Sequence, residues 1–481
     1  MSDGPTLKHH GRTKIIATVG PACRHPEGLA ALIEAGANIF RLNMAHGEIA
    51  HHAEVLASIR KVSKQLKRPI GVLVDLAGPK IRLGELPGGQ LDCKLGDSFC
   101  FIRGDVPKAA DELVTTYPLL VDEVAPGNTI MLADGAVSMV VEEKTEDHIR
   151  CRVVQPGLVR SRQGLNLPGA KLSAPAMDDD DREHARWAAE NGIDFIGLSF
   201  VRQAADVREL KNLLSQRGSP AQVIAKIEKP EALLVLEDIV SAADGVMVAR
   251  GDLGVEIDVA RMPMVQKQII ATCQRHQKPV IIATQMLESM QNSRRPTRAE
   301  VTDIANAIID GGDACMLSGE TAIGQYPCEA VEMMNQVALA TEELYRDRAP
   351  LPPTAFSVAG LHPITRAVVH GAGQIAFEIK AALIVVASHS GATGLALSKQ
   401  RNYPPIVGVS DSEECLRQMS LLWGIIPLVD APTTNSGDLL DFVVSWGLRN
   451  GRLHSGDHVV LVAGVGLGSG AHNMVRVHRV S

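Results

Sequence analysis

Residues 222–254 read QVIAKIEKPEALLVLEDIVSAADGVMVARGDLG. The apolar run Gln222–Ile227 predicts a strand, Glu231–Ser241 has the length and spacing of a helix, and Asp244–Ala249 predicts a second strand. Continuous runs of Val, Ile and Ala are typical of strands that are buried on both faces. A strand, a helix and a strand in succession therefore predict a parallel sheet.

The same alternation extends along most of the chain. Eight short apolar runs precede stretches of helical length, and they cover Lys14–Val19, Asn38–Leu42, Gly71–Asp75, Asp194–Ser199, Gln222–Ile227, Asp244–Ala249, Pro279–Thr284 and Asp313–Leu317. Eight units favour a closed (β/α)8 TIM barrel, while the count alone leaves an open doubly wound sheet as an alternative. In such a barrel the catalytic residues lie at the carboxyl ends of the strands.

The 481 residues of the chain are nearly twice the roughly 250 of a typical barrel, so we expect further domains. Residues 84–170 carry turn signals and short β-rich runs, which predict a small all-β domain inserted after the third strand. Beyond the proline-rich residues 349–353 the alternation restarts, which predicts a Rossmann-like α/β domain over residues 351–481. Residues 1–83 and 171–350 then form the two parts of the barrel.

Composition argues against several classes of protein. The chain has only eight Phe, four Tyr and three Trp and a net charge of −7, so it lacks the aromatic clusters and the basic face of a nucleic-acid-binding protein. No apolar stretch approaches the roughly 18 residues of a membrane span, and the N-terminus lacks the apolar core of a signal peptide. The eight dispersed cysteines form no CxxC pair and are typical of reduced thiols, so we expect a cytoplasmic protein.

Charged residues gather at the predicted carboxyl ends of the strands. Glu228 and Asp252 come from adjacent strands, and a hard cation such as Mg2+ binds through one or two carboxylates together with substrate oxygens and water. Lys226 lies two residues before Glu228, so both side chains point to the same face of the strand. Together with Arg41 and Arg82, these groups are suited to binding a multiply charged anion. Enzymes that transfer phosphoryl groups bind them with such sets of cationic side chains and metal ions.

Each of these residues also has a purely structural interpretation. Lys226 and Glu228 can form a structural ion pair, and Asp252 can cap a helix. His46, which follows the second strand, can be a surface or capping histidine, and Arg82 can form a salt bridge at a hinge. The agreement among several independent strands favours one shared site over these separate interpretations.

At these residues the chain resembles the pyruvate kinase family, nearly from end to end. The segments that carry the resemblance are KIIATVGP (14–21), RLN (41–43), GLNLPG (164–169), AKIE (225–228), ARGDLGVE (249–256), ATQMLESM (283–290), RPTRAE (295–300) and MLSGETA (316–322). The resemblance implies that the chain transfers the phosphoryl group of phosphoenolpyruvate to ADP in glycolysis, giving pyruvate and ATP.

The resemblance also implies catalytic roles for single residues. Glu228 and Asp252 correspond to the ligands of Mg2+, which Mn2+ can replace, and this ion also holds phosphoenolpyruvate oxygens. Lys226 and Arg41 correspond to the cations on the transferring phosphoryl group, and Lys226 also stabilises the enolate. Thr284 corresponds to the threonine on the face where enolpyruvate is protonated, either directly or through water.

Further residues are implied to bind the two substrates. The backbone at Gly251 and Asp252 corresponds to the site of the phosphoenolpyruvate carboxylate. Asn43, His46 and Arg82 correspond to residues on the nucleotide side, where a second Mg2+ arrives with ADP.

The inserted domain corresponds to the mobile lid of the family, with Asp134 and Arg162 on its inner face. Closure of such a lid excludes water from the transfer.

Two stretches depart from the pattern of the many family members that bind K+. Residues 43–46 read NMAH, where Ala45 removes a hydroxyl ligand, and residues 75–83 read DLAGPKIRL, where Lys80 replaces a glutamate. An ammonium there supplies the unit charge of K+, so the chain resembles the K+-independent branch, with Lys80 and Asp75 in place of the cation site. Alternatively, Lys80 is an exposed lysine and K+ still binds through Asn43 and Asp75.

The C-terminal domain resembles a regulatory module. The segment SHSGAT (388–393) follows a predicted strand and opens a helix, a geometry suited to phosphate. It resembles the family's sugar-phosphate effector loop, so we expect a sugar phosphate or AMP to bind Ser388, Ser390, Gly391 and Thr393. The alternatives are a simple capped turn and no effector, because the neighbouring residues 464–470 lack the aromatic and arginine residues of relatives that respond to fructose 1,6-bisphosphate. The resemblance also implies a homotetramer.

Two other classes of function stay open at this point. A metal-dependent lyase or aldolase acting on pyruvate or oxaloacetate also pairs Glu and Asp on a divalent metal, but it needs neither a nucleotide side nor a lid. A catalytically weak scaffold or sensor would use only the C-terminal site, and the presence of Lys226, Glu228, Asp252 and Thr284 argues against it.

Overall fold

The computed structural model of the chain describes residues 10–133, 135–170, 173, 175–352, 358, 361–433, 435–464 and 473–481. Its centre is a closed barrel of parallel strands in the order β1-β16-β15-β14-β13-β12-β3-β2. These strands are Lys14–Thr18 (β1), Ile39–Asn43 (β2), Gly71–Asp75 (β3), Phe195–Leu198 (β12), Gln222–Ile227 (β13), Gly245–Ala249 (β14), Val280–Ala283 (β15) and Ala314–Leu317 (β16). Each overlaps one of the predicted apolar runs, so the barrel is confirmed and the open sheet is excluded.

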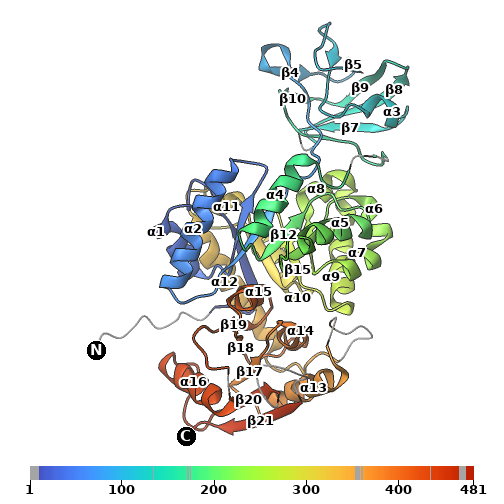
Figure 1. The fold of residues 1–481 in the computed structure, drawn as a ribbon. Helices are drawn as coiled ribbons and strands as arrows, with labels where there is room; N and C mark the ends of the chain where they lie inside the picture. The colour runs from blue at the N-terminus through green and yellow to red at the C-terminus, as the bar shows by residue number, and fades with distance from the viewer. Residues whose placement is uncertain are drawn as a thin grey trace.

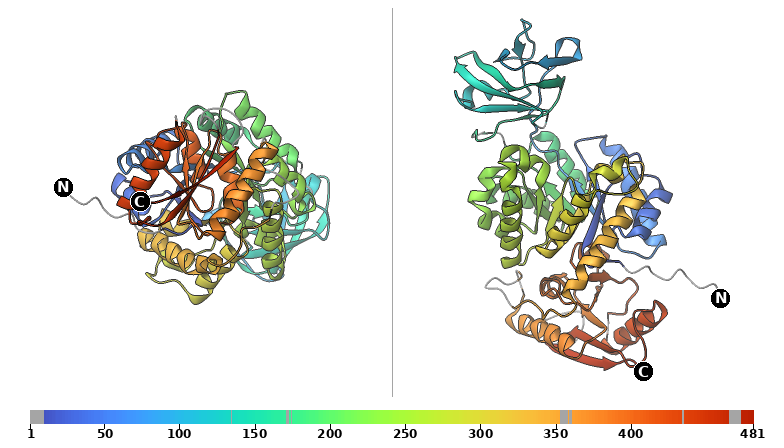
Figure 2. Two further views of the ribbon diagram at one scale, coloured as in Figure 1. Left: turned by 90° about the horizontal axis from the view of Figure 1, so that it is seen from below. Right: turned by 180° about the vertical axis from the view of Figure 1, so that it is seen from behind.

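Helices surround the barrel, as Figures 1 and 2 show. They are Pro26–Ala35 (α1), Ile49–Gln65 (α2), Asp179–Glu190 (α4), Ala204–Ser215 (α5), Pro230–Leu234 (α6), Leu236–Ala242 (α7), Arg250–Glu256 (α8), Met262–Arg275 (α9), Arg298–Ile309 (α10), Gly319–Ala322 (α11) and Pro327–Glu342 (α12), with 3-10 turns at Val259–Arg261, Glu288–Gln291 and Glu343–Tyr345. The single helix predicted over Glu231–Ser241 is wrong, because the backbone leaves the helical region at Val235 (φ −126°, ψ 29°) and separates α6 from α7.

Local sequence explains where several helices begin. Asp178 caps α4, since its side chain accepts from the Asp181 backbone N–H, and the Asp181 side chain accepts in return from Asp178. Thr297 and Glu300 form the same reciprocal pair at the start of α10. The acidic run 178–181 thus lies at the start of α4, where acidic side chains complement the helix dipole.

The inserted lid domain lies beyond the carboxyl end of β3, at one end of the molecule (Figures 1 and 2). Its strands are Gln90–Cys93 (β4), Ser98–Ile102 (β5), Glu112–Leu113 (β6), Thr129–Leu132 (β7), Val137–Lys144 (β8), His148–Gln155 (β9), Gly157–Arg160 (β10) and Leu165–Asn166 (β11). They form a two-stranded sheet and a six-stranded mixed sheet around a separate apolar core. The lid is not wholly β, since it includes the single helical turns Pro87–Gly89 and Leu120–Glu123 (α3).

The C-terminal domain is a three-layer α/β unit. Its elements are Pro363–Glu378 (α13), Leu383–Ala387 (β17), Ala392–Lys399 (α14), Ile406–Val409 (β18), Glu413–Met419 (α15), Ile425–Pro427 (β19), Ser436–Arg449 (α16), His458–Ala463 (β20) and Met474–Arg479 (β21). Helices α13, α14 and α15 cover one face of the sheet and α16 covers the other. The antiparallel edge strand β21 was not predicted, because its outer face is half-exposed and carries no continuous apolar run.

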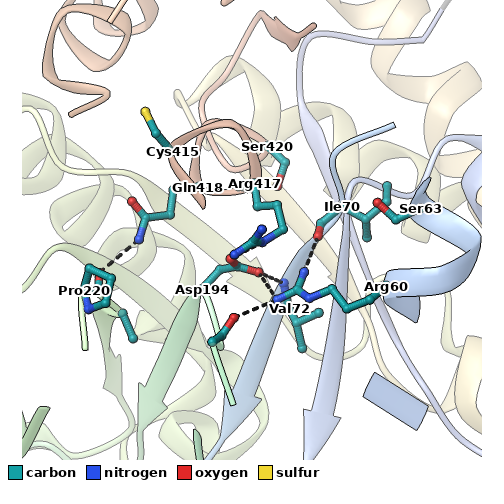
Figure 3. A network of polar contacts seen from close by, with 12 residues as sticks. Arg60, Ser63, Ile70, Val72, Asp194, Pro220, Cys415, Arg417, Gln418 and Ser420 are labelled. Atoms are coloured by element: carbon teal, nitrogen blue, oxygen red, sulfur yellow. Dashed lines mark hydrogen bonds and ion pairs between the residues drawn. The ribbon is translucent and has the colours of Figure 1, made fainter. Parts of the chain in front are cut away.

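The C-terminal domain closes the amino-terminal end of the barrel. Leu421, which follows α15, is buried in the same apolar cluster as the inward-facing residues of the barrel strands. Asp194, just before β12, accepts hydrogen bonds from Arg60 of α2 (2.9 Å) and Arg417 of α15 (2.7 Å), as Figure 3 shows. The two domains therefore share both apolar and ionic contacts.

All eight cysteines are free, and seven of them are buried. Among the described residues, no helix is long and apolar enough to cross a membrane.

Candidate active site

Lys226 forms the centre of the charged cluster at the carboxyl ends of the strands. Its Nζ lies 2.9 Å from Glu228 Oε1 and 3.1 Å from Asp75 Oδ1, and it donates a hydrogen bond to Ser199 Oγ at 2.6 Å. Burial alone would lower the pKa of Lys226, but the attraction of Asp75 and Glu228 outweighs it and raises the pKa above its usual value. Lys226 is therefore a permanent buried cation.

Arg41 supplies a second cation from β2. Its Nε donates to Asp75 Oδ2 at 2.6 Å and its Nη1 donates to Thr18 Oγ1 at 3.2 Å. Burial would raise the pKa of Asp75, but Lys226 and Arg41 outweigh it and hold the pKa below its usual value. Asp75 thus fixes both cations on the same side of the barrel mouth.

Glu228 is held by the loop after β12. Its Oε2 accepts a hydrogen bond from the Phe200 backbone N–H at 2.7 Å. Phe200 has a left-handed backbone (φ 52°), which is uncommon for a bulky residue and which directs this N–H at the carboxylate. Burial and the nearby Asp252 raise the pKa of Glu228.

Sequence reasoning missed the part played by the loop after β12. Ser199 bridges Lys226 to the backbone, because its hydroxyl donates to the Leu76 carbonyl at 2.7 Å. The signal was present, since Ser199 and Phe200 stand at the carboxyl end of the predicted fourth strand, where functional residues are expected.

Thr284 lies on a strained turn after β15. Its Oγ1 accepts the Gly251 N–H at 2.7 Å and donates to the Ala283 carbonyl at 2.6 Å. Thr284 and Gln285 both have left-handed backbones, with φ values of 69° and 52°. For a β-branched residue such a conformation costs about 1–3 kcal/mol and needs support from its surroundings.

Arg250 supplies that support and was also missed. Its guanidinium donates to the carbonyls of Thr284 (2.6 Å) and Gln285 (3.2 Å) and to the Asp303 carboxylate (2.6 Å). The residue stands directly before the predicted Gly251 and Asp252, but its contacts with β15 and α10 depend on the tertiary fold.

Glu228 and Asp252 form a donor pair that fits a divalent cation. Asp252 is the third residue of α8, so it does not cap that helix, and it is close enough to influence the pKa values of both Glu228 and Lys226. Across the described residues there is no group of three or more His, Cys, Asp or Glu that could hold a metal alone. Two carboxylates suit Mg2+, which takes its other ligands from substrate oxygens and water.

The predicted nucleotide residues lie at or beyond the ends of the neighbouring strands β2 and β3. Asn43 ends β2 and is the register partner of Asp75, and the exposed His46 follows in the next turn. Arg82 lies where the chain enters the lid, and its Nη1 donates to the carbonyl of Arg162 at 3.2 Å. The structure therefore brings Asn43 to the cluster and places Arg82 at the junction with the lid.

Two predictions concern the inner face of the lid. Arg162 forms an ion pair with Glu85 at 2.6 Å, within the lid itself. Asp134 lies outside the described residues, so its place on the inner face of the lid stays a prediction.

Lys80 is exposed and lines a small cavity, of about 50 Å3, between barrel and lid. Asp252, Phe200 and the lid residue Asn166 line the same cavity. Asp75 pairs with Arg41 and Lys226, and within the described part of the chain no ion pair joins Lys80 to Asp75.

The predicted effector loop joins β17 to α14. Ser388 and Thr393 are buried, Ser390 is exposed, and Gly391 has the left-handed backbone (φ 80°) that lets the chain turn into the helix. The partner loop, residues 464–470, lies outside the described residues beyond Gly464.

Comparisons with known proteins agree with this geometry. A family model described as the barrel domain of pyruvate kinase matches residues 10–331, and one described as its alpha/beta domain matches residues 366–478. Pyruvate kinase of Geobacillus stearothermophilus is 41% identical over 475 residues, which cover 98% of this chain and 80% of the relative. Pyruvate kinase 2 of Synechocystis is 41% identical over 474 residues, which cover 98% and 79%.

A solved structure agrees over the whole fold. The crystal structure of a pyruvate kinase from Cryptosporidium parvum matches with a TM-score of 0.90 and 33% identity, over 99% of this chain and 97% of that chain. These matches do not favour a lyase or aldolase. The chain belongs to the pyruvate kinase family, the phosphotransferases of glycolysis that convert phosphoenolpyruvate and ADP to pyruvate and ATP.

Proposed function

We propose that the cluster around Lys226 performs the transfer of the phosphoryl group from phosphoenolpyruvate to ADP. Lys226 stabilises the charge of the transferring phosphoryl group and of the enolate, and Arg41 binds the phosphoryl oxygens. The observation that carries this assignment is the burial of Lys226 between Asp75 and Glu228, which keeps its ammonium charged and fixed before substrate binds. Such a preorganised cation needs no rearrangement when charge develops.

Glu228 and Asp252 would hold Mg2+ or Mn2+, with phosphoenolpyruvate oxygens and water completing the shell. The ion supplies Lewis-acid stabilisation of the phosphoryl and enolate oxygens when bound. The Phe200 N–H keeps Glu228 directed at this position.

Thr284 would line the face on which the enolate receives its proton. Its hydroxyl is held by Gly251 and Ala283, so it has a fixed orientation. The substrate carboxylate would bind the backbone N–H groups at Gly251 and Asp252 and would compete with Thr284 Oγ1 for the Gly251 donor.

ADP and its own Mg2+ would bind beside Asn43, His46 and Arg82. Arg82 already joins the barrel to the lid through Arg162, so closure of the lid would move this cation together with the nucleotide. Closure would exclude water, which would otherwise accept the phosphoryl group.

The test is a coupled assay that follows pyruvate formation with and without ADP. We expect pyruvate to form only when ADP, phosphoenolpyruvate and Mg2+ are all present. Release of pyruvate without ADP would instead indicate a lyase, and no turnover with saturating substrates would indicate a scaffold or sensor.

We also propose that the reaction needs no K+, because the ammonium of Lys80 supplies the charge of that cation. The support is the sequence pattern at Ala45 and Lys80 together with the position of Lys80 on the cavity shared with Asp252. We expect equal activity in tetramethylammonium and potassium salts, whereas Lys80→Glu should become K+-dependent and the exposed Lys61→Glu should not. A large activation of the unaltered enzyme by K+ would overturn the proposal.

The loop that opens α14 would bind an effector, a sugar phosphate or AMP, through Ser388, Ser390, Gly391 and Thr393. The support is a left-handed glycine directly before a helix start, which leaves backbone N–H groups for a phosphate. Calorimetric titration with a panel of sugar phosphates and AMP tests this, and the heat should disappear in Thr393→Glu.

Assembly as a homotetramer and residence in the cytoplasm stay predictions from family resemblance and cysteine usage. Sedimentation of the full chain measures the first, and fractionation of cells that express it measures the second.

A further inference from the structure

A second cavity, of about 310 Å3, lies where the barrel meets the C-terminal domain. The end of α9, the residues Leu351 and Pro352, α13 and the end of α14 form its walls. In Figure 1, α9 lies above α13 and α14 on the same side of the molecule. The catalytic cluster lies at the opposite, carboxyl-terminal end of the barrel, so this cavity is a separate space.

The walls of this interdomain cavity are strongly cationic. Arg275, Arg366, Lys399 and Arg401 line it together with His370, and no described lining residue is acidic. Glu237 pairs with Arg275 from outside the cavity, and the single carboxylate of Asp313 pairs with both Lys399 and Arg401.

Arg366 adds a further positive charge to the lining of the cavity. It is exposed on the first turns of α13, and in the described part of the chain its guanidinium has no ion pair. His370 stands four residues later, on the same face of the helix. On the side of the C-terminal domain, the cavity therefore has one cation, Arg366, that no carboxylate of the described residues balances.

Two buried nitrogen atoms of the lining residues have no hydrogen-bond partner among the described residues. They are Nη1 of Arg401 and Nδ1 of His370. Arg401 is 6% exposed, and its other contacts go to the Gly311 carbonyl, to Asp313 and to the face of Trp423. Both atoms are closed off from the cavity, so a ligand there would first meet the exposed guanidinium of Arg366.

We propose that the interdomain cavity binds a phosphate monoester of a small organic molecule. A dianionic phosphate matches the excess positive charge, and its oxygens can accept from the exposed Arg366 and from the ring of His370 on the same helix face. Inorganic phosphate would leave most of the 310 Å3 unfilled. Leu351, Leu361 and Val369 offer an apolar wall for the organic part of the ligand.

This site differs from the loop that opens α14. The loop lies at the first residue of α14 and the cavity at its last, and the eight residues of the helix separate them by about 12 Å. Lys399 also donates to the Lys278 carbonyl and Asp313, which stand before β15 and β16, so a ligand here would contact both domains.

Calorimetric titration of the full chain tests the proposal. The probes are inorganic phosphate, glucose 6-phosphate and AMP, with glucose and adenosine as uncharged controls. We expect saturable binding of at least one ester, weaker binding of inorganic phosphate, none of glucose or adenosine, and weaker binding at higher salt.

Variants locate the site. Arg366→Glu and His370→Gln should each lower the affinity for the ester roughly tenfold or more, because each removes a charge-assisted contact, and neither should change basal activity. Arg208→Glu, an exposed charge reversal on α5, and Thr393→Glu should leave this binding unchanged. The proposal fails if no ester binds, or if Arg366→Glu binds as well as the unaltered chain while Thr393→Glu does not.

Discussion

The Lys226 ammonium lies 2.9 Å from the Glu228 carboxylate, with both side chains buried at the end of β13. The two residues are two positions apart in the chain, so the alternation of side chains along a strand places them on the same face. Asp75, at the end of β3, which only β12 separates from β13, holds the same ammonium at 3.1 Å. A cation compensated in this way is stable in the interior, yet it can still attract an anion that arrives at the mouth.

Lys226→Met should lower turnover by roughly a thousandfold while weakening phosphoenolpyruvate binding only modestly. The reason is that the ammonium is needed most when charge develops on the phosphoryl group and the enolate. Steady-state kinetics with the coupled assay measures both effects. Lys211→Met, which removes a half-exposed ion pair with Asp244, is the matched control, and near-normal turnover of Lys226→Met would refute the role.

Asp252→Asn should raise the Mg2+ concentration needed for half-maximal activity about tenfold or more, because it removes one of the two carboxylates that we propose as ligands of the ion. Titration of activity with MgCl2 measures the change, and full removal of the ion with a chelator should abolish activity in every variant. The exposed Asp238→Asn serves as control. An unchanged Mg2+ requirement would show that Asp252 is not a ligand.

Arg250→Lys should lower kcat by roughly tenfold to a hundredfold with a smaller change in KM. A lysine cannot donate to the carbonyls of Thr284 and Gln285 and to Asp303 at once, so the strained turn loses its support. Arg261→Lys, at an exposed site, is the control. If kcat is retained, the turn is held by other contacts and Arg250 is only structural.

Asp181 should make folding stability depend on pH. Burial first, and then the nearby Asp178, raise its pKa from 3.8 to about 6. The protonated form is therefore favoured in the folded state, and its stabilisation, up to about 3 kcal/mol, is full below pH 3.8 and lost as pH rises through 6.

Asp181→Asn should remove this dependence, since an amide cannot ionise. Urea unfolding between pH 4.5 and 7.5 should show the variant gaining stability relative to the unaltered chain as pH rises. Asp179→Asn, exposed in the same turn, should follow the unaltered chain at every pH. Parallel curves for Asp181→Asn and the unaltered chain would contradict the raised pKa.

Asp194→Asn should destabilise the contact between the barrel and the C-terminal domain by about 3–5 kcal/mol. The carboxylate is fully buried and accepts from Arg60, from Arg417 and from the Val72 N–H, so the variant leaves two guanidinium groups without their counter-charge (Figure 3). Urea unfolding measures the loss. Asp430→Asn, which breaks an exposed pair with Lys67, should cost less than about 1 kcal/mol, and equal losses would contradict the argument.

Much of the fold was predictable because its signals are local. Each barrel strand is a short apolar run, and burial on both faces requires such a run wherever the strand stands in the barrel. The break between α6 and α7 and the edge strand β21 were not predictable in this way. Val235 leaves the helical region inside an otherwise helical sequence, and β21 exists because β20 offers it an open edge.

The candidate site, like the fold, was predictable from the sequence only where its signals are local. The sequence by itself determined the residue types at the strand ends and the common face of Lys226 and Glu228, because strand geometry fixes the direction of side chains two residues apart. Only the tertiary structure decided that Asp75 and Ser199 complete the surroundings of Lys226 and that Arg250 supports Thr284. These contacts join different strands, and the closure of the barrel sets their distances, which no local pattern encodes.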